Sequence, residues 1–292
     1  MRKLLLSLAL GLGLMASTAT AAEESPNKGG LKFDATLDVV SNYYFRGYLQ
    51  TNSGFIVQPG VYVGVSVFEN DQFNLMLTGG VWSSMHTDQK SDALGAAIKS
   101  PEGLYEIDFV VRLDTVIAKQ FKVGAVFTWY TYPSYVSGEI LELGFEGRWL
   151  SYETAKSAGS PVSFDVYGGV YFELYDDSFA GASNDIFAKL GVELGLLQPV
   201  KAGDVSFEIV FPIELGLSFQ DYYFESDGTN DVLGYIMAGA QAGMNLPMPA
   251  QYGAWKVVAG AYIYYLQSDS VENANNGEEF AYSAKVGLAI SY

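Results

Sequence analysis

The stretch Leu104-Tyr105-Glu106-Ile107-Asp108-Phe109-Val110-Val111-Arg112-Leu113-Asp114-Thr115 decides the fold class. Apolar side chains occupy one set of alternate positions: Tyr105, Ile107, Phe109, Val111 and Leu113. The charged residues all fall between them. Successive side chains of a β-strand point to opposite faces, so strict alternation is typical of a strand with one apolar and one polar face.

The same period of two recurs along the rest of the chain. The expected strands are residues 31–45, 55–68, 73–83, 104–116, 121–132, 139–150, 162–174, 186–196, 205–219, 232–246, 254–266 and 280–292. That is an even number of strands, about twelve. No segment shows a convincing helical stripe, and no repeat or linker divides residues 23–292, so we predict a single domain. Pro212, which cannot donate to a ladder, predicts a bulge in its strand.

Charges in the strand bodies share one phase, and the opposite phase is apolar. A soluble β-sandwich also alternates, so this pattern alone does not separate a sandwich from a membrane barrel. Strand length favours the barrel, since many of the predicted strands reach ten or more residues. Tilted membrane strands have about 9–11 residues, whereas strands in globular proteins have roughly 5–6. We therefore predict a transmembrane antiparallel up-and-down β-barrel whose charges point inward.

Aromatic residues and connection lengths support a barrel. One expected aromatic girdle comprises Tyr43, Tyr44, Phe45, Tyr48, Trp82, Trp129, Tyr130, Tyr132, Tyr222, Tyr223, Tyr264 and Tyr265; the other comprises Trp149, Tyr152, Tyr252, Trp255 and Tyr292. Such girdles mark the two lipid headgroup regions. Connections near residues 69–72 and 117–120 are short, whereas 84–103, 220–231 and 267–279 are long and polar. Short turns at one end and long loops at the other are typical of outer-membrane barrels. Residues 133–138 and 151–161 fit this contrast less well.

The N-terminus predicts export. Arg2 and Lys3 precede an apolar run, Leu4–Met15, and small residues follow at 19–22, which is the pattern of a cleaved signal peptide over residues 1–22. The chain contains no Cys and one His, which excludes a disulfide framework and a multi-histidine metal site. A net charge of −17 argues against a nucleic-acid partner. Together these features predict the outer membrane of a Gram-negative cell.

Inward-phase charges are the candidate functional residues, because they would line a lumen. The pore-lining candidates are Arg46, Glu106, Asp108, Arg112, Asp114, Glu142, Glu146, Arg148, Glu193, Glu208 and Glu214. Acids outnumber bases on this phase, which predicts a weakly cation-favouring, porin-like channel for passive diffusion of small polar solutes. Paired charges that fill a closed interior are the alternative, since a barrel of this size lies between filled and open ones. That alternative is a non-conducting structural or surface-interaction barrel.

Enzymatic readings are weaker. His86 near Ser83 and Ser84 leaves open an enzyme acting on lipids, but a Ser-His pair needs geometry rather than sequence proximity. We expect His86 to lie in a solvated loop. The sequence predicts no catalytic residue, no metal site and no cofactor. Acids in the long loops favour solvated surface charge, with divalent-cation bridging to lipopolysaccharide as the other possibility.

The last expected strand ends on an aromatic residue. Phe280, Tyr282, Ala284, Val286, Leu288, Ile290 and Tyr292 occupy alternate positions. Such a strand resembles the closing strand through which barrel-assembly machinery recognises outer-membrane proteins. The expected partners are therefore that machinery, outer-membrane lipid and lipopolysaccharide, together with small polar solutes.

Residues 41–51 read Ser-Asn-Tyr-Tyr-Phe-Arg-Gly-Tyr-Leu-Gln-Thr. This resembles the S-x-Y-x-F-R-G-x-x-Q opening motif of a family of uncharacterised proteobacterial outer-membrane proteins, and residues 58–64 resemble that family's second strand. The resemblance covers about the first two strands. It implies a signal peptide and a porin-like barrel, but no substrate. From their phase, Asn42, Tyr44 and Arg46 would face inward at the outer mouth, where Arg46 either forms a structural ion pair or contacts a solute.

Overall fold

A computed structural model describes residues 30–70, 72–88, 103–134, 138–176, 185–202 and 205–292. The expected signal peptide at residues 1–22 lies outside these residues. No helix within the described ranges is long and apolar enough to cross a membrane.

Twelve long strands build the molecule. They are β1 (Leu31–Val40), β4 (Ile56–Glu69), β5 (Phe73–His86), β6 (Leu104–Ile117), β7 (Phe121–Thr131), β8 (Glu139–Trp149), β9 (Val162–Asp176), β10 (Ile186–Leu196), β12 (Val205–Gln220), β13 (Leu233–Asn245), β14 (Ala254–Leu266) and β15 (Phe280–Ser291). Shorter elements are β2 (Tyr43–Phe45), β3 (Tyr48–Thr51), α2 (Tyr152–Ser157), β11 (Val200–Ala202), η2 (Ala250–Tyr252) and α3 (Asp269–Ala274).

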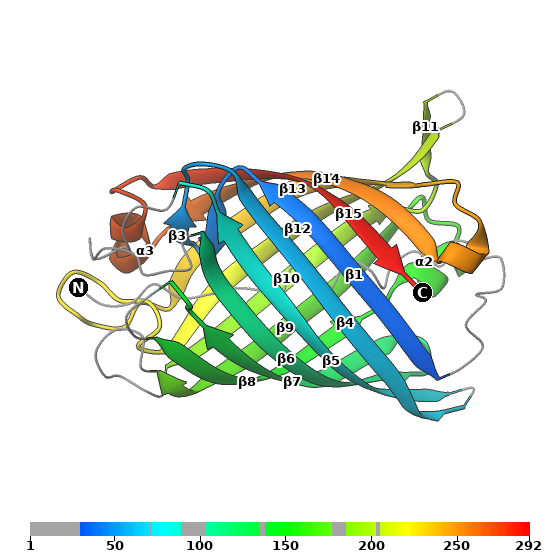
Figure 1. Cartoon of the computed structure of the whole chain (residues 1–292), viewed down its shortest axis with the longest axis horizontal. Coiled ribbons are helices and arrows are strands. Elements are labelled where there is room, and N and C mark those ends of the chain that lie inside the picture. The colour runs from blue at the N-terminus through cyan, green and yellow to red at the C-terminus, as the bar shows by residue number, and fades with distance from the viewer. Residues whose placement is uncertain (1–29, 71, 89–102, 135–137, 177–184, 203–204) are drawn as a thin grey trace.

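These strands close into an antiparallel up-and-down barrel (Figure 1). Each long strand pairs with its sequence neighbours, and β1 pairs with both β4 and β15, so the first and last strands complete the ring. Closure leaves no long strand with an unpaired edge, as hydrocarbon requires of a spanning sheet. The predicted fold class and strand number are confirmed.

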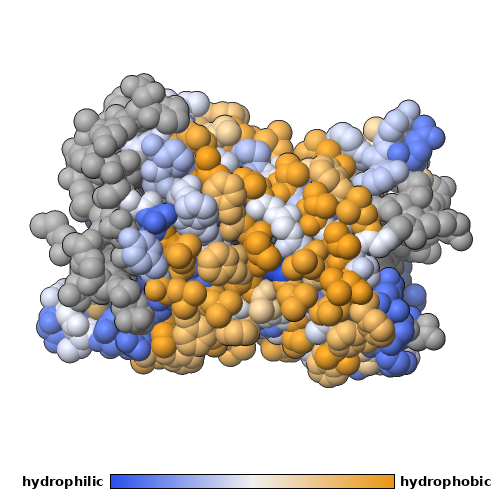
Figure 2. Space-filling view, turned by 60° about the horizontal axis from the view of Figure 1, so that its bottom comes forward, coloured by the Kyte–Doolittle hydropathy of each residue, from blue (hydrophilic) through white to orange (hydrophobic). Residues whose placement is uncertain are grey.

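The direction of the charges follows the predicted phase. Phe109 and Val111 on β6 are 41% and 50% exposed on the outside, whereas Glu106 and Asp108 of the same strand are 0% and 1% exposed. On the face shown in Figure 2, hydrophobic residues cover the middle of the barrel and hydrophilic residues gather toward the two ends. Since a barrel interior alternates with its exterior along every strand, this hydrophobic surface and the inward charges share one cause.

The two ends of the barrel differ. The described chain begins and ends at one end, together with α2, η2 and a projecting hairpin formed by β11 and the start of β12 (Figure 1). The opposite end carries the β2–β3 hairpin and α3. The predicted contrast between short and long connections is therefore present. Two six-residue helices interrupt the connections, and both are too short to produce a helical stripe in the sequence.

The predicted end of the first strand, at residue 45, is wrong. Barrel pairing of β1 stops at Val40, and the chain then turns into the β2–β3 hairpin, where Phe45 pairs with Tyr48. Arg46 and Gly47 form its two-residue turn with φ of 48° and 85°. Positive φ at both central residues is the geometry of a type I′ turn, which matches the strand twist and favours Gly. The Arg-Gly step therefore produces a hairpin rather than a strand end.

The expected bulge at Pro212 is also wrong. Pro212 pairs with Glu193 of β10 in unbroken register. On the side of β13, Val210 pairs with Gln241 and Ile213 pairs with Ala238. These two pairs keep the same register, and the pairs expected between them are absent. The strand therefore accommodates a residue without an N–H by losing local ladder contacts toward β13 rather than by inserting an extra residue.

Tyrosine rings cover glycines on the inner wall. Each lies directly across from its glycine on the neighbouring strand, in the pairs Tyr62–Gly80, Tyr167–Gly191, Tyr171–Gly144, Tyr235–Gly216 and Tyr262–Gly239. A Cβ built on any of these glycines would collide with the facing ring. The glycines thus make room for aromatic rings to lie flat against the wall, as in aromatic rescue of strand glycines.

We expect Gly144→Ala to destabilise the barrel by about 1–3 kcal/mol, because overpacking forces side chains or backbone to shift. Its new methyl group would lie 2.5 Å from Tyr171 Cδ1 and 2.8 Å from Val126 Cγ1. Gly147→Ala on the same strand is the matched control, since nothing lies within 4 Å of that Cβ position. The measurement is the temperature at which each variant loses its folded gel mobility in detergent. Equal temperatures for the two variants would contradict the packing role.

Candidate functional site: an occluded lumen

The β2–β3 hairpin crosses the lumen from one wall to the other. It leaves the barrel after β1, and its tip reaches β8, β9 and β10, which lie on the opposite side of the ring in the strand order. Arg46 Nη2 lies 2.8 Å from both carboxylate oxygens of Glu142 on β8. The pore-lining candidate Arg46 is therefore inside the barrel, in an ion pair, and buried.

Aromatic rings surround the Arg46 guanidinium. Its central carbon lies 4.1 Å from the ring centre of Phe187, 4.7 Å from that of Phe45, 4.9 Å from that of Tyr171 and 5.2 Å from that of Tyr222. Burial opposes the charge, but Glu142, Tyr222 and Tyr130 together more than reverse this effect, so the pKa of Arg46 lies well above its usual value. Cations over aromatic faces are attracted by the ring quadrupole, most strongly when desolvated.

Further hydrogen bonds fix the tip and sides of the hairpin. Tyr223 Oη donates to the Arg46 carbonyl at 2.9 Å, and Asn275 Nδ2 donates to the Gly47 carbonyl at 2.8 Å. Tyr48 Oη donates to the Tyr222 carbonyl at 2.9 Å, and Tyr43 Oη donates to Glu106 Oε2 at 2.9 Å. The loops after β12 and β14 and the wall at β6 and β8 therefore all hold this one segment.

The outer aromatic girdle is largely a wrong prediction. Most of its residues pack inside the barrel around the hairpin rather than against lipid: Tyr43, Phe45, Tyr48, Trp82, Tyr130, Tyr222 and Tyr223 are buried, and Tyr44, Tyr132 and Tyr264 pack against them. Trp129 and Tyr265 do face outward, as do Tyr252 and Tyr292 at the other end. Aromatic residues near a strand end can fill the mouth of a barrel as readily as they can meet headgroups, and their sequence position does not separate the two.

Ion pairs line much of the rest of the described interior. All eight inward cations have a carboxylate partner: Lys32–Asp34, Arg46–Glu142, Arg112 with Asp114 and Glu146, Lys122–Asp114, Arg148 with Asp165 and Glu193, Lys189–Glu146, Lys256–Glu208 and Lys285–Asp38. The candidates Arg112, Asp114, Glu146, Arg148, Glu193 and Glu208 all belong to this network. Removing one partner of such a buried pair is costly, because it leaves the other charge uncompensated.

Three candidate acids lack such a partner. Within the described residues, Glu106, Asp108 and Glu214 have no cation at ion-pair distance. Glu214 accepts a hydrogen bond from Tyr235 Oη at 2.7 Å, and neither carboxylate oxygen of Asp108 has a hydrogen-bond partner. The interior therefore carries a surplus of carboxyl groups, and Glu106 and Asp108 lie beside the base of the hairpin near Tyr43.

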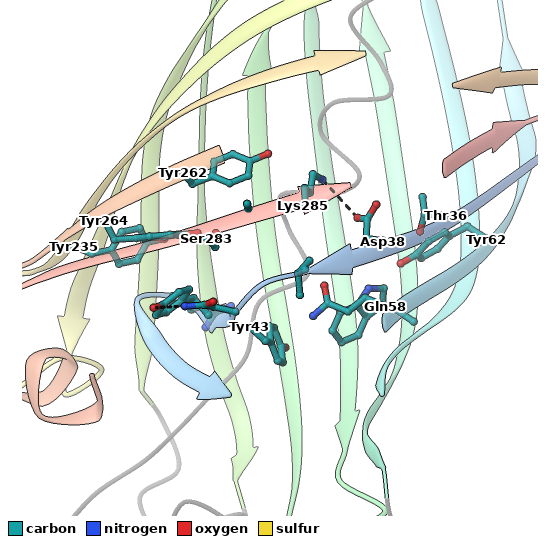
Figure 3. A pocket seen from close by; sticks show the side chains of 16 residues that line it. Thr36, Asp38, Tyr43, Gln58, Tyr62, Tyr235, Tyr262, Tyr264, Ser283 and Lys285 are labelled. Atoms are coloured by element: carbon teal, nitrogen blue, oxygen red, sulfur yellow. Dashed lines mark hydrogen bonds and ion pairs between the residues drawn. The ribbon is translucent and has the colours of Figure 1, made fainter. Parts of the chain in front are cut away.

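A cavity of about 130 Å³ remains between the hairpin and one wall (Figure 3). Its walls come from β1, β4, β5, β13, β14 and β15, and residues of the hairpin segment, including Tyr43 and Arg46, close another side. Asp38 of β1 and Lys285 of the neighbouring β15 form an ion pair at 3.5 Å on one wall of the cavity (Figure 3). Polar groups from Thr36, Gln58 and Ser283 face the same space as the rings of Tyr62, Tyr262 and Tyr264 (Figure 3).

The expected solvated position of His86 is wrong. His86 ends β5 and is buried, with Ser84 Oγ 2.9 Å from its Nε2 and its ring stacked on Tyr105 at 4.5 Å between centres. The buried position of His86 was not predicted because the strand was expected to end at residue 83, whereas β5 continues to His86. A serine and a histidine are thus hydrogen-bonded, but Ser84 is wholly buried, and nucleophilic attack needs a substrate within reach of that hydroxyl.

The inward position of Tyr171, Tyr235 and Tyr262 was not predicted from the sequence. A signal was present: Tyr171 and Tyr262 lie on the charged phase of their strands, Tyr235 shares the phase of the polar Gln241 and Asn245, and each of the three lies opposite a glycine in the ladder. An aromatic residue on the polar phase therefore indicates a filled part of the lumen, a distinction that a list of charges alone does not make.

No family model matches the chain, and no curated protein matches it. Among solved structures, the chain is similar to the beta domain of the Bordetella autotransporter Brka, with a TM-score of 0.47 and 11% identity over 90% of this chain and 99% of that one. It is also similar to an outer membrane channel from Pseudomonas putida F1, with a TM-score of 0.48 and 9% identity over 90% and 96%. A KdgM porin matches with a TM-score of 0.42 and 9% identity over 89% and 99%. These are likenesses of barrel architecture alone.

A closed antiparallel barrel with an apolar belt outside and charges inside is a protein of the outer-membrane β-barrel class.

We expect Glu142→Gln to loosen the hairpin, because it leaves the buried Arg46 charge without its anion, at a cost of about 3–5 kcal/mol. The chain has no cysteine, so a single Leu49→Cys in β3 reports hairpin exposure through its rate of maleimide labelling. The matched control is Glu139→Gln, whose carboxylate accepts only from the exposed Trp129. Faster labelling is expected with Glu142→Gln alone. Unchanged labelling would contradict a hairpin held by this ion pair.

Proposed function

We propose that the protein is a porin-like channel for passive diffusion of small polar solutes, narrowed at its outer end by the β2–β3 hairpin. The observation that carries this proposal is the polar, charged interior, because a barrel with a purely structural role does not need to turn so many ionisable groups into its lumen. Diffusion past the hairpin would be slow and size-limited.

A weak preference for cations is part of the proposal. Glu214 supports it, because it is an inward acid with no cation at ion-pair distance among the described residues and acidic groups that line a pore favour cations. Acids in the described outer loops also support it, with Asp227 and Asp269 held ionised by hydrogen bonds from Thr229 and Ser226 that lower the pKa of each. Negative charge at a mouth raises the local concentration of cations.

The second candidate is a closed barrel with a structural or surface-interaction role. The hairpin favours it, because a buried Arg46 tip and seven buried aromatic residues fill the outer end of the lumen. An enzyme acting on lipids is the least supported reading, given that Ser84 is inaccessible inside the barrel.

The proposed location and partners are those expected of an outer-membrane β-barrel. We propose export through a cleaved signal peptide, and membership of the family whose opening motif residues 41–51 resemble. Strand β15 presents Phe280, Tyr282 and Val286 outward, and Tyr292, which follows it, is also exposed. This supports recognition by barrel-assembly machinery and contact with outer-membrane lipid and lipopolysaccharide.

Conductance of the protein in planar bilayers tests the channel proposal. We expect small conductance steps and, in a salt gradient, a reversal potential shifted toward the equilibrium potential of the cation. Arg46→Ala should increase both the step size and the cation preference, because it frees Glu142 and loosens the hairpin. Lys201→Ala in the projecting β11 removes the same charge outside the lumen and should change neither. Absence of steps in the wild type and in Arg46→Ala would favour the closed barrel. Unchanged selectivity of Arg46→Ala with lower thermal stability would assign Arg46 a structural role only.

A further inference from the structure

The cavity beside the hairpin combines aromatic faces with polar groups. Trp82 lies 5.8 Å from Tyr43, and Tyr44 lies 5.1 Å from Tyr264, measured between ring centres. Ligand sites are mostly lined by apolar and aromatic surface with a few convergent polar groups that fix orientation. Here the polar groups are the side chains of Thr36, Gln58 and Asn42.

The volume restricts the ligand. An engineered cavity of about 150 Å³ in another protein admits one benzene molecule. The present cavity of about 130 Å³ is similar in size and partly open, so it holds one six-membered ring, with the substituents that do not contact the lining directed toward the opening. Longer ligands would have to displace the hairpin.

The charged residues of the lining further restrict the kind of ligand. Lys285 is paired with Asp38 at 3.5 Å, and Arg46 with Glu142 at 2.8 Å, so each charge that lines the cavity already has a partner. A charged ligand would have to break one of these pairs. A purely apolar ring would not use the hydrogen-bonding capacity that remains on the Thr36 hydroxyl and on the amides of Asn42 and Gln58, whose nitrogens already donate to Tyr44 Oη and Ser84 Oγ.

We propose that this cavity binds a neutral pyranose sugar. A pyranose ring has C–H faces that pack on aromatic rings and hydroxyl groups that both donate and accept hydrogen bonds, which matches the two kinds of lining. The inference rests on the proposed channel function and gives it a solute class: a sugar would pause here on its way past the hairpin. Binding must remain weak, since a solute that passes has to leave its site.

Titration of the full-length protein in detergent with D-glucose tests the proposal by calorimetry. We expect saturable binding with a Kd on the order of 1 mM. D-mannitol offers hydroxyl groups on an open chain without a ring face and should bind much more weakly. D-glucuronate keeps the ring but adds a charge and should also bind more weakly than glucose.

Two substitutions that remove polar groups from the lining should weaken glucose binding. Thr36→Val and Gln58→Leu should each raise the Kd roughly threefold to tenfold, the loss of one hydrogen bond. Thr128→Val makes the same change on β7, outside the cavity, and should leave the Kd unchanged. Folded gel mobility is checked for each variant, so that loss of binding is not confused with loss of folding.

No saturable binding of glucose, equal binding of mannitol, or tighter binding of glucuronate would each overturn the proposal, as would an equal effect of Thr128→Val. Conductance measured on the same preparation separates this result from the channel proposal. Conductance steps without glucose binding would overturn the sugar site and leave the channel. Glucose binding without steps would overturn the channel and keep the site in a closed barrel.

Discussion

Backbone N–H and C=O groups have no water to bond with in hydrocarbon, and this constraint governs the whole molecule. Only a sheet that closes on itself satisfies every ladder position, and here β1 completes the ring by pairing with β15. Closure then divides each strand into one face toward lipid and one toward the lumen. The apolar phase and the charged phase of the sequence are the two consequences of that division.

Charges turned away from lipid still need compensation, because the interior is confined. The chain meets this need by pairing every inward cation with a carboxylate and by filling the outer end with aromatic rings. The β2–β3 hairpin completes that filling: it carries its own cation, Arg46, across the lumen to Glu142. Tyrosine rings that lie over glycines take up little space along the inner wall, which leaves room for this packing. Polar pairs, a crossing hairpin and a small cavity together describe a narrow passage rather than a wide pore.

The alternation of residues 104–115 predicted a strand with one apolar face, and alternation together with strand length predicted the barrel, because the period of two follows from strand geometry and the length from bilayer thickness. The pairing of Arg112 or Arg148 with neighbouring acids follows from the same phase. The hairpin could not be predicted in this way, since residues 31–45 were expected to form one continuous strand and only the Arg46-Gly47 turn distinguishes a folded-in segment from a continuing strand. The inward position of Tyr222 and Tyr223 depends on tertiary packing against Tyr48, which no local pattern specifies.

The claim that hydrocarbon meets the apolar phase and never the charged one is tested most directly by tryptophan quenching in brominated phosphatidylcholine. One variant keeps Trp129 as its single tryptophan and another keeps Trp82, while the remaining tryptophans are replaced by phenylalanine. Trp129 faces outward and Trp82 inward, so brominated lipid should strongly quench the first and leave the second nearly unchanged. Equal quenching of the two, or quenching of Trp82 alone, would contradict the account.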